Sequence, residues 1–329
     1  MPQPSYPYAN ARLAALSKRL LDAPTIRRMA DGTLADAMRT LQDLRYGGMS
    51  DAGDTNVEQL IDNELFETVR EIREITPNAK ATDLFLQKYD VQNLKVLQKA
   101  RQLGVQAPEL SRCGTIDPEK LGEMVREQNY AELPGAFRDT LTQLEKELTV
   151  RVDPQHISAS LDAAYLVHAL ETAKGDKVLL QYFRALCDFD NALTFLRVRA
   201  MGGTKEMLAE LLLPEGGIPK EQLMQTLDVS FEQINRLLNQ SVCREALLAG
   251  LNAMQHTGNI GEVEKARDNY LISLFNSHRY ETDSIYPVIG YLLAKERESR
   301  VIRLIITAKR NKLPDTVIAE RLVTLYGER

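Results

Sequence analysis

Apolar residues recur at helical spacing along the chain, and a stretch near the C-terminal end shows the pattern most clearly. In Ile289–Pro314 they return every three or four residues on both sides of a polar centre, Lys295–Arg300. Cations cluster at the C-terminal end, where they suit the helix dipole, and Pro314 favours termination there. Glu298 falls on the apolar stripe. The pattern predicts one long helix with charged residues in its middle.

Two upstream stretches, Asp83–Arg101 and Gln181–Arg199, repeat this pattern. When the three are aligned, an acid lies three residues before a central position and a base lies eight residues after it. The acid, central residue and base are Asp90, Asn93 and Arg101, then Asp188, Asn191 and Arg199, then Glu298, Val301 and Lys309. We call the three stretches the first, second and third signature helices. Their spacing of about a hundred residues predicts three copies of one unit.

The signature places charge on an apolar face. Acid and base are eleven residues apart, so they share a face but lie about 16 Å apart along the axis. Asp90 and Arg101 therefore need partners from outside their own helix, because an unpaired charge on an apolar face is costly. We expect the three acids to pair with bases from other helices and so pin neighbouring helices together. The alternative is that the signature residues line a cavity or contact a partner.

The rest of the chain also reads as helices, with no predicted strand. Thr33, with Asp36 three residues on, is typical of a helix start. Asp117 and Asp153 are typical N-caps, each followed by proline. The further helices predicted are Tyr8–Leu21, Thr33–Leu44, Val57–Ile75, Leu133–Leu148, His156–Lys174, Lys220–Asn239, Val242–Gln255, Glu262–Ser277 and Asp315–Tyr326. The fold class predicted is all-α, with helical repeats at 1–110, 111–212 and 213–329.

Composition narrows the possible partners. The 329 residues carry a net charge of −5, which gives no general reason to expect nucleic-acid binding. Residues 295–312 are locally basic, and we favour a solvated face there over a surface for an acidic partner. The start of the sequence has no signal-peptide pattern, and no window is apolar enough to span a membrane. Three isolated cysteines favour a reducing, intracellular location.

Motifs for catalysis or cofactor binding are missing from the sequence. Gly202–Lys205 has the letters of a phosphate loop in the wrong order and follows a predicted helix, so it is interpreted as a helix end. His168 and Glu171 have a spacing used by some metal sites, but no second such pair accompanies them. We therefore predict no catalytic residue, no cofactor, no metal and no bound nucleotide. A repeated helical unit without such residues favours a binding or mechanical role.

Several segments resemble one known family. YANAR at Tyr8–Arg12, YLLAKERESRVIR at Tyr291–Arg303 and LVTLYG at Leu322–Gly327 are similar to the opening and closing parts of the C subunit of V-type and archaeal-type rotary ATPases, which is the homologue of the eukaryotic d subunit. NLKVL at Asn93–Leu97 and NALTFLR at Asn191–Arg197 fit its earlier repeats. The similarity covers essentially the whole chain.

The resemblance implies a funnel of three related helical-bundle domains with approximate three-fold pseudosymmetry. It implies a non-catalytic central-stalk subunit, peripheral to the cytoplasmic face of the membrane, that joins the central shaft (D- and F-type subunits) to the membrane rotor ring for proton or sodium transport. Arg303 joins the signature residues as a candidate structural or interface residue. Val301 departs from the asparagine of the first two copies, which weakens any strict three-fold role for that asparagine.

Two alternatives come from other classes. A generic α-helical scaffold or protein-interaction module would also repeat helices, although its repeats usually run about 20–50 residues. An enzyme with a helical metal core would need ligands that the sequence does not supply. Copurification with shaft and ring subunits would distinguish a rotary-ATPase subunit from both alternatives. Bound iron or zinc would indicate the enzyme.

Overall fold

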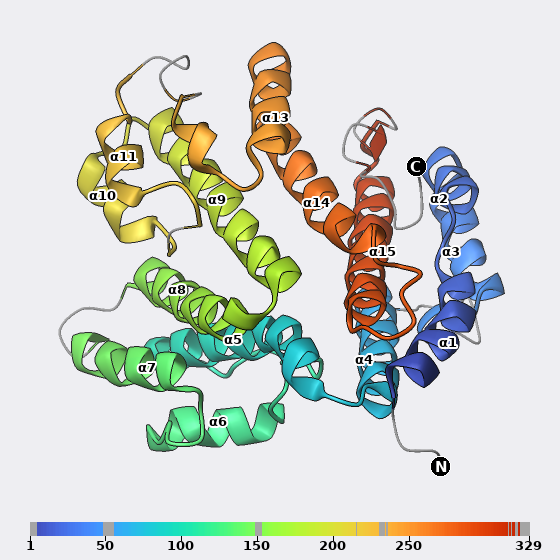
Figure 1. Cartoon of the computed structure of the whole chain (residues 1–329). Coiled ribbons are helices and arrows are strands. Elements are labelled where there is room, and N and C mark those ends of the chain that lie inside the picture. The colour runs from blue at the N-terminus through green and yellow to red at the C-terminus, as the bar shows by residue number, and fades with distance from the viewer. Residues whose placement is uncertain are drawn as a thin grey trace. The chain divides into compact units, whose positions relative to one another are not determined.

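The computed structural model describes residues 5–48, 56–148, 153–214, 216–229, 234, 236–314, 316, 318, 319 and 322. Every regular element in these residues is a helix, so the predicted all-α fold class is confirmed (Figure 1). The helices are α1 (Tyr6–Leu16), α2 (Ala23–Asp31), α3 (Leu34–Asp43), α4 (Val57–Ile75), α5 (Ala79–Leu103), α6 (Pro118–Glu127), α7 (Gly135–Leu148), α8 (Pro154–Thr172), α9 (Lys177–Ala200), α10 (Lys205–Leu211), α11 (Lys220–Gln225), α13 (Arg244–Thr257), α14 (Gly261–Asn276) and α15 (Tyr286–Arg310). None of these described helices is long and apolar enough to cross a membrane.

Packing divides the chain into two compact units. The terminal unit comprises Met1–Thr82 and Ile272–Arg329, and the central unit comprises Asp83–Leu271. The third signature helix, in α15, belongs to the terminal unit, while the first two, in α5 and α9, belong to the central unit. The predicted repeat boundaries fall in the loops after α5 and α10, and the three-repeat division with its pseudosymmetry stays a prediction.

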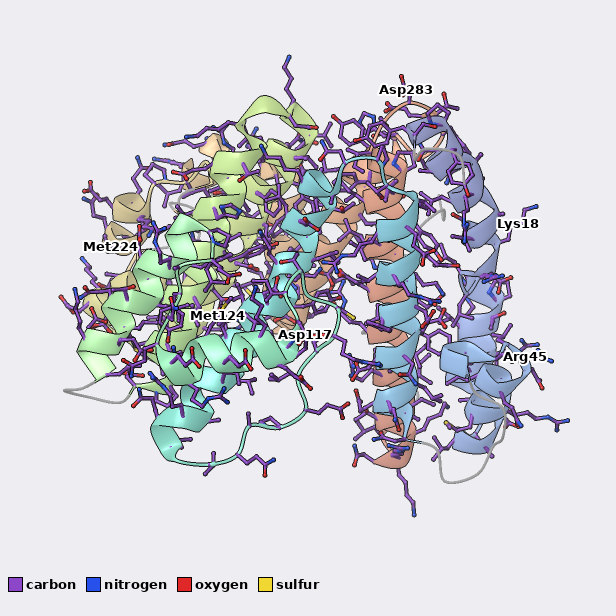
Figure 2. The ribbon with its side chains drawn as sticks, turned by 90° about the horizontal axis from the view of Figure 1, so that it is seen from below. Lys18, Arg45, Asp117, Met124, Met224 and Asp283 are labelled. Atoms are coloured by element: carbon purple, nitrogen blue, oxygen red, sulfur yellow. The ribbon has the colours of Figure 1, made fainter. Side chains whose placement is uncertain are left out.

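Short polar side chains begin several helices where the sequence predicted them. The Thr33 hydroxyl accepts the N–H of Asp36, and the Asp36 carboxylate accepts the N–H of Thr33, which completes a capping box at α3. Asp117 caps α6, where Figure 2 labels it, and Asp153 caps α8. Each such cap contributes about 1 kcal/mol by satisfying amides that the helix leaves unpaired.

All three signature helices end in the same way. Gly104 and Gly202 follow the first two with φ of 65°, and Lys312 follows the third with φ of 53°. The next N–H then bonds the carbonyl five residues back, in the pairs Val105 to Ala100, Gly203 to Val198 and Leu313 to Ala308. This is the Schellman arrangement, in which a left-handed residue closes the last turn. The predicted helix end at Gly202 is therefore confirmed.

Helix α15 forms the centre of the terminal unit. Helices α1, α2, α3 and α4 all contact it, and Figures 1 and 2 both show α4 lying beside it. The apolar positions that predicted this helix, among them Ile289, Leu292, Ile302 and Ile305, are completely buried. Each buried side chain of this size stabilises the fold by about 1.5–3 kcal/mol.

Aromatic rings join α5, α8 and α9 in the core of the central unit. The Phe85 ring lies 5.0 Å from that of Tyr182 and 5.4 Å from that of Phe183, measured between centroids. Tyr165 packs edge-on against Phe183 at 6.2 Å and donates its hydroxyl to the Leu84 carbonyl at 2.9 Å. These contacts join the first two signature helices to α8 between them in the sequence.

Three expectations need correction or lie outside the described residues. The helix predicted at Lys220–Asn239 is not continuous: α11 ends at Gln225, helical residues appear again at Ile234, Arg236 and Leu237, and a 3-10 turn lies at Leu238–Gln240, while 230–233 and 235 lie outside the described residues. Most of the closing helix predicted at Asp315–Tyr326 lies outside the described residues. The basic stretch 295–312 is solvated only in part, because every residue from Lys295 to Ser299 is buried whereas Arg300, Arg310 and Lys312 are exposed.

Candidate functional site

The acid of the first signature helix holds the loop that follows α5. Asp90 is 2% exposed. Its Oδ2 accepts the Thr115 N–H at 2.9 Å and the Thr115 hydroxyl at 2.6 Å, while Oδ1 accepts the Ile116 N–H at 3.1 Å. Hydrogen bonds to a charged acceptor are roughly twice as strong as neutral ones. The carboxylate therefore fixes the start of α6 against the middle of α5.

The second acid makes the same kind of contact. Asp188 is completely buried in α9. Its Oδ1 accepts the N–H groups of Gly217 and Ile218 at 2.8 and 3.1 Å, and its Oδ2 accepts the Ser241 hydroxyl at 2.6 Å. In both helices the acid meets backbone amides of a loop at the position where we predicted a base from another helix.

The third acid combines a loop amide with an ion pair. Glu298 is 1% exposed, and its Oε2 accepts the N–H of Leu21 at 2.5 Å. Its Oε1 accepts a hydrogen bond from Lys295 Nζ at 2.9 Å. The prediction that the acid pairs with a base from another helix is wrong here, because Lys295 lies one turn earlier in the same helix.

Glycines allow the backbone to approach the first two acids closely. A Cβ added to Gly114 would collide with the Asp90 carboxylate, and one added to Gly216 would collide with that of Asp188. Both glycines lie two residues before the isoleucine whose amide the acid accepts. The residue two positions before Leu21 is Arg19, an exposed residue, rather than a glycine. Glutamate is one methylene longer than aspartate, so this loop can stay further from the helix.

The central asparagines clamp the same loops at a second point. Asn93 donates to the Ser111 carbonyl at 2.8 Å and accepts the Ser111 N–H at 2.9 Å. Asn191 accepts the Leu213 N–H at 2.8 Å and donates to the Leu213 carbonyl at 3.3 Å. Val301 holds this position in α15 with an apolar, buried side chain. The third helix therefore lacks the amide clamp of the other two.

The three bases donate to carbonyl groups at or just beyond the C-terminal end of a short helix. Arg101 donates to the Val125 carbonyl at 3.3 Å in the last turn of α6. Arg199 donates to the Val229 carbonyl at 2.7 Å, beyond the end of α11. Lys309 donates to the Ala30 carbonyl at 2.6 Å and to that of Gly32, at the end of α2. A cation suits this end because terminal carbonyls lack partners within the helix and carry the negative end of its dipole.

Arg101 is also tied to a carboxylate and an amide. It forms an ion pair with Glu145 of α7, which also accepts hydrogen bonds from Tyr130 and Gln98. Burial would raise the pKa of Glu145, but the hydrogen bonds from Arg101, Tyr130 and Gln98 outweigh it and lower the pKa. The base of the first signature helix therefore joins α5, α6 and α7.

Lys295 is the centre of a buried charge cluster in the terminal unit. Its Nζ lies 2.7 Å from Glu64 Oε1 of α4 and over the Tyr46 ring, 5.6 Å from the centroid. The Tyr46 hydroxyl in turn lies 3.2 Å from Ser299 Oγ. Burial alone would lower the pKa of Lys295, but the carboxylates of Glu298 and Glu64 raise it. The lysine therefore stays charged and joins α4 to α15.

Arg303 lies apart from this cluster. Its Nε donates to Glu58 Oε2 of α4 at 2.7 Å, and the two side chains are 41% and 53% exposed. An exposed pair of this kind contributes about 0–1 kcal/mol. The structure therefore brings Glu298, Lys309 and Arg303 to different neighbours along one helix rather than into a single site.

A cavity of about 530 Å³ lies within the central unit among α5, α8 and α9. Its charged lining is largely neutralised by protein groups. The contacts are Asp190 with Arg267 at 2.7 Å, Arg197 with Glu264 at 2.5 Å, and Asp162 with Lys95. A ligand would meet ion pairs that are already satisfied, so the cavity alone indicates no ligand class.

The arrangement offers support rather than reactive groups. Within the described parts of the chain, no three His, Cys, Asp or Glu side chains form a group that could hold a metal ion. The cysteines Cys113, Cys187 and Cys243 are buried thiols. Burial raises the pKa of Cys243 to about 12, which makes it a poor nucleophile.

Sequence reasoning missed Gly114, Gly216 and the clustering around Lys295. The glycines were recognisable in principle, since each lies two residues before an isoleucine and just before a helix. They were missed because the segment from Asp188 to Gly216 is longer than the segment from Asp90 to Gly114, so a fixed offset does not align them. The burial of Lys295 depends on Glu64 and Tyr46, which are distant in sequence.

Comparison with known proteins gives a consistent result. The family described as the ATP synthase (C/AC39) subunit matches residues 9–321. The C subunit of the A-type ATP synthase of Methanocaldococcus jannaschii is 24% identical, over 97% of this chain and 86% of that protein. The C subunit of the V-type sodium ATPase of Enterococcus hirae is 24% identical, over 84% of each chain. The C subunit of the A-type ATP synthase of Pyrococcus furiosus is 25% identical, over 98% of this chain and 90% of that protein.

Proposed function

Because the chain belongs to the ATP synthase (C/AC39) subunit family, we propose that it is the socket that joins the central shaft of a rotary ATPase to the membrane rotor ring. Family membership makes the chain a non-catalytic subunit of such a complex. The proposal adds its place and partners: the cytoplasmic face of the membrane, shaft subunits of the D and F type, and the rotor ring.

The observation that supports the proposal is the repeated bracing of the signature helices. Each helix holds a loop at its acid and the end of a short helix at its base, eleven residues further on. In α9, for example, Asp188 holds Ile218 while Arg199 holds Val229. A part that transmits torque must resist bending and twisting, and a helix fixed at two separated points to its neighbour does so. The same bracing on all three helices suits a part loaded from several sides.

Reconstitution without the chain tests the proposal. The catalytic head, shaft and membrane domain are reconstituted into vesicles with and without it, and ATP hydrolysis and ion uptake are measured together. We expect omission to leave hydrolysis by the head intact and to abolish ion uptake linked to it. We also expect less shaft to remain with the ring, and both effects to reverse when the chain is added back.

Two variants serve as controls for that experiment. Arg303→Ala removes only an exposed ion pair, so it should restore coupling as the unmodified chain does. Gly216→Ala introduces a collision beside Asp188 and should restore coupling poorly. A normal ratio of ions moved to ATP hydrolysed without the chain would overturn the socket proposal and leave the helical-scaffold alternative in its place.

A further inference from the structure

We call residues 17–32 the N-terminal arm. The arm contacts the acid and the base of α15, as the segments after α5 and α9 contact the acids and bases of those helices. The Glu298 carboxylate accepts the Leu21 N–H near the start of the arm, and Lys309 donates to the Ala30 carbonyl near its end. Helix α2 lies between these contacts, just as α6 lies between the contacts of Asp90 and Arg101. We propose that the arm is a displaceable clasp that closes the third repeat.

Chain connectivity distinguishes the clasp from its two counterparts. Ile116 lies 26 residues after its acid and Ile218 lies 30 residues after its acid, so each closing segment continues from its own helix. Leu21 lies 277 residues from Glu298. The third repeat is therefore closed by the opposite end of the chain, and its closing segment can leave α15 without pulling on that helix's own continuation.

The clasp is also fastened by fewer hydrogen bonds. Asp90 accepts two backbone N–H groups and one hydroxyl from Thr115 and Ile116, and Asp188 accepts two backbone N–H groups from its closing segment and one hydroxyl from Ser241. Among the described residues of the arm, Leu21 alone donates to Glu298. Val301 replaces the asparagine that clamps the other two loops. The apolar side chains of Ile26 and Met29 are buried, so the arm is docked in the closed state, held at its end by Lys309 but without an asparagine clamp near Leu21.

The surroundings of the arm would stay in place when it opens. On one side, Asn10 of α1 donates to the carbonyls of Glu281, Thr282 and Ser284, at 2.9–3.1 Å. On the other, α3, which follows the arm, contacts α15, and α4 remains joined to α15 by the pairs of Lys295 with Glu64 and Arg303 with Glu58. Lys295 also keeps its contact with Glu298, so release of the Leu21 amide leaves the carboxylate paired. The arm is thus a strap with fixed ends.

Release of the arm would open the third repeat locally and reversibly, while the closing segments of the first two repeats stay bound. This inference does not depend on the proposed socket function, because it concerns the isolated chain. It predicts a local opening that is separate from global unfolding, as low-stability segments show in native proteins.

Native-state hydrogen exchange of the intact chain tests the clasp at three matched amides. Leu21, Ile116 and Ile218 each donate to the acid of a signature helix. We expect the Leu21 amide to exchange at least about tenfold faster than the other two, with little dependence on denaturant, as a local opening requires. Equal protection of all three amides, or a Leu21 rate that follows global unfolding, would overturn the proposal.

Two isosteric substitutions then locate the fastening. Glu298→Gln should accelerate exchange at Leu21 about tenfold further and leave Ile116 and Ile218 unchanged, because Glu298 contacts Leu21 and Lys295 in the terminal unit and neither of those two amides. Asp188→Asn is the matched control and should accelerate Ile218 without changing Leu21. The amide of Ile305 in α15 reports whether either variant unfolds globally. If Glu298→Gln accelerates Ile305 and Leu21 together, the arm opens only with the whole unit and the clasp proposal fails.

Discussion

The second and third signature helices solve one problem with different chemistry. Asp188 in α9 is stabilised by two backbone amides and a serine hydroxyl. Glu298 in α15 is stabilised by one amide and a lysine on its own helix. Both carboxylates are buried, and each avoids the cost of an unpaired charge. An acid at one position in a repeated pattern therefore specifies a held neighbour but leaves the partner's chemistry open.

The two carboxylates also differ in what happens when the segment they hold is released. In α9 the loop that the carboxylate holds supplies both of its backbone donors, so releasing that loop leaves the buried charge with the Ser241 hydroxyl and no bound cation such as Lys295 provides in α15. In α15 the ion pair with Lys295 persists when the N-terminal arm leaves. A buried charge that loses two of its three donors costs more free energy than an ion-paired carboxylate that loses one. The central unit should thus resist local opening more strongly at this position than the terminal unit.

The largest expected difference is in stability. Asp188→Ala leaves two buried amides and a hydroxyl without their acceptor, and should lower the free energy of unfolding by about 3–5 kcal/mol. Glu298→Ala should cost less, about 2 kcal/mol, because Lys295 keeps Glu64 as its partner. Urea denaturation of both variants measures the two values. Equal losses would show that the two closures are energetically alike.

A moderate effect is expected from the glycine beside Asp188. Gly216→Ala places a methyl group against the Asp188 carboxylate and the Arg184 carbonyl, and should cost about 1–3 kcal/mol through forced displacement. Arg19→Ala, at the matching position of the arm, should change stability by less than about 0.5 kcal/mol because Arg19 is exposed. Thermal melting of both variants checks this, and a tolerated Gly216→Ala would show that the loop has room to move.

A smaller effect should appear in the acid range. Because the pKa of Glu145 is lowered in the folded chain, its contribution to stability is present above its unfolded value of 4.5. It is lost as pH falls through the lower folded value. Glu145→Gln should therefore reduce the loss of stability below pH 4.5, measured by urea denaturation at several pH values. Glu132→Gln, in an exposed ion pair, is the control. If Glu145→Gln loses stability below pH 4.5 as the unmodified chain does, the lowered pKa of Glu145 is contradicted.

The smallest effect concerns the helix ends. Lys312 adopts the left-handed conformation that glycine adopts after the other two signature helices. Lys312→Gly should stabilise the chain by about 1 kcal/mol by removing the Cβ clash of that conformation. Gly202→Ala is the converse change and should destabilise by a similar amount. A destabilised Lys312→Gly variant would mean that the lysine side chain contributes more than its backbone costs.

The sequence by itself determined the local structure. Helical spacing of apolar residues predicted the long helices, with Val57–Ile75 placed to the residue. Thr33, Asp117 and Asp153 predicted helix starts because capping needs only the next two or three amides. The repeated acid and base predicted that each signature helix needs outside partners, since eleven residues are too far apart to pair. The resemblance of five short segments identified the family, which the comparisons then established.

Only the tertiary structure decided which groups those partners are. A buried acid needs either a cation or several donors, and periodicity does not distinguish the two. The backbone amides of Gly217 and Ile218 serve Asp188, whereas Lys295 and one backbone amide serve Glu298. The third helix instead receives Leu21 from the opposite end of the chain. The two residues of that contact are 277 positions apart in the sequence, so local sequence carries no record of it.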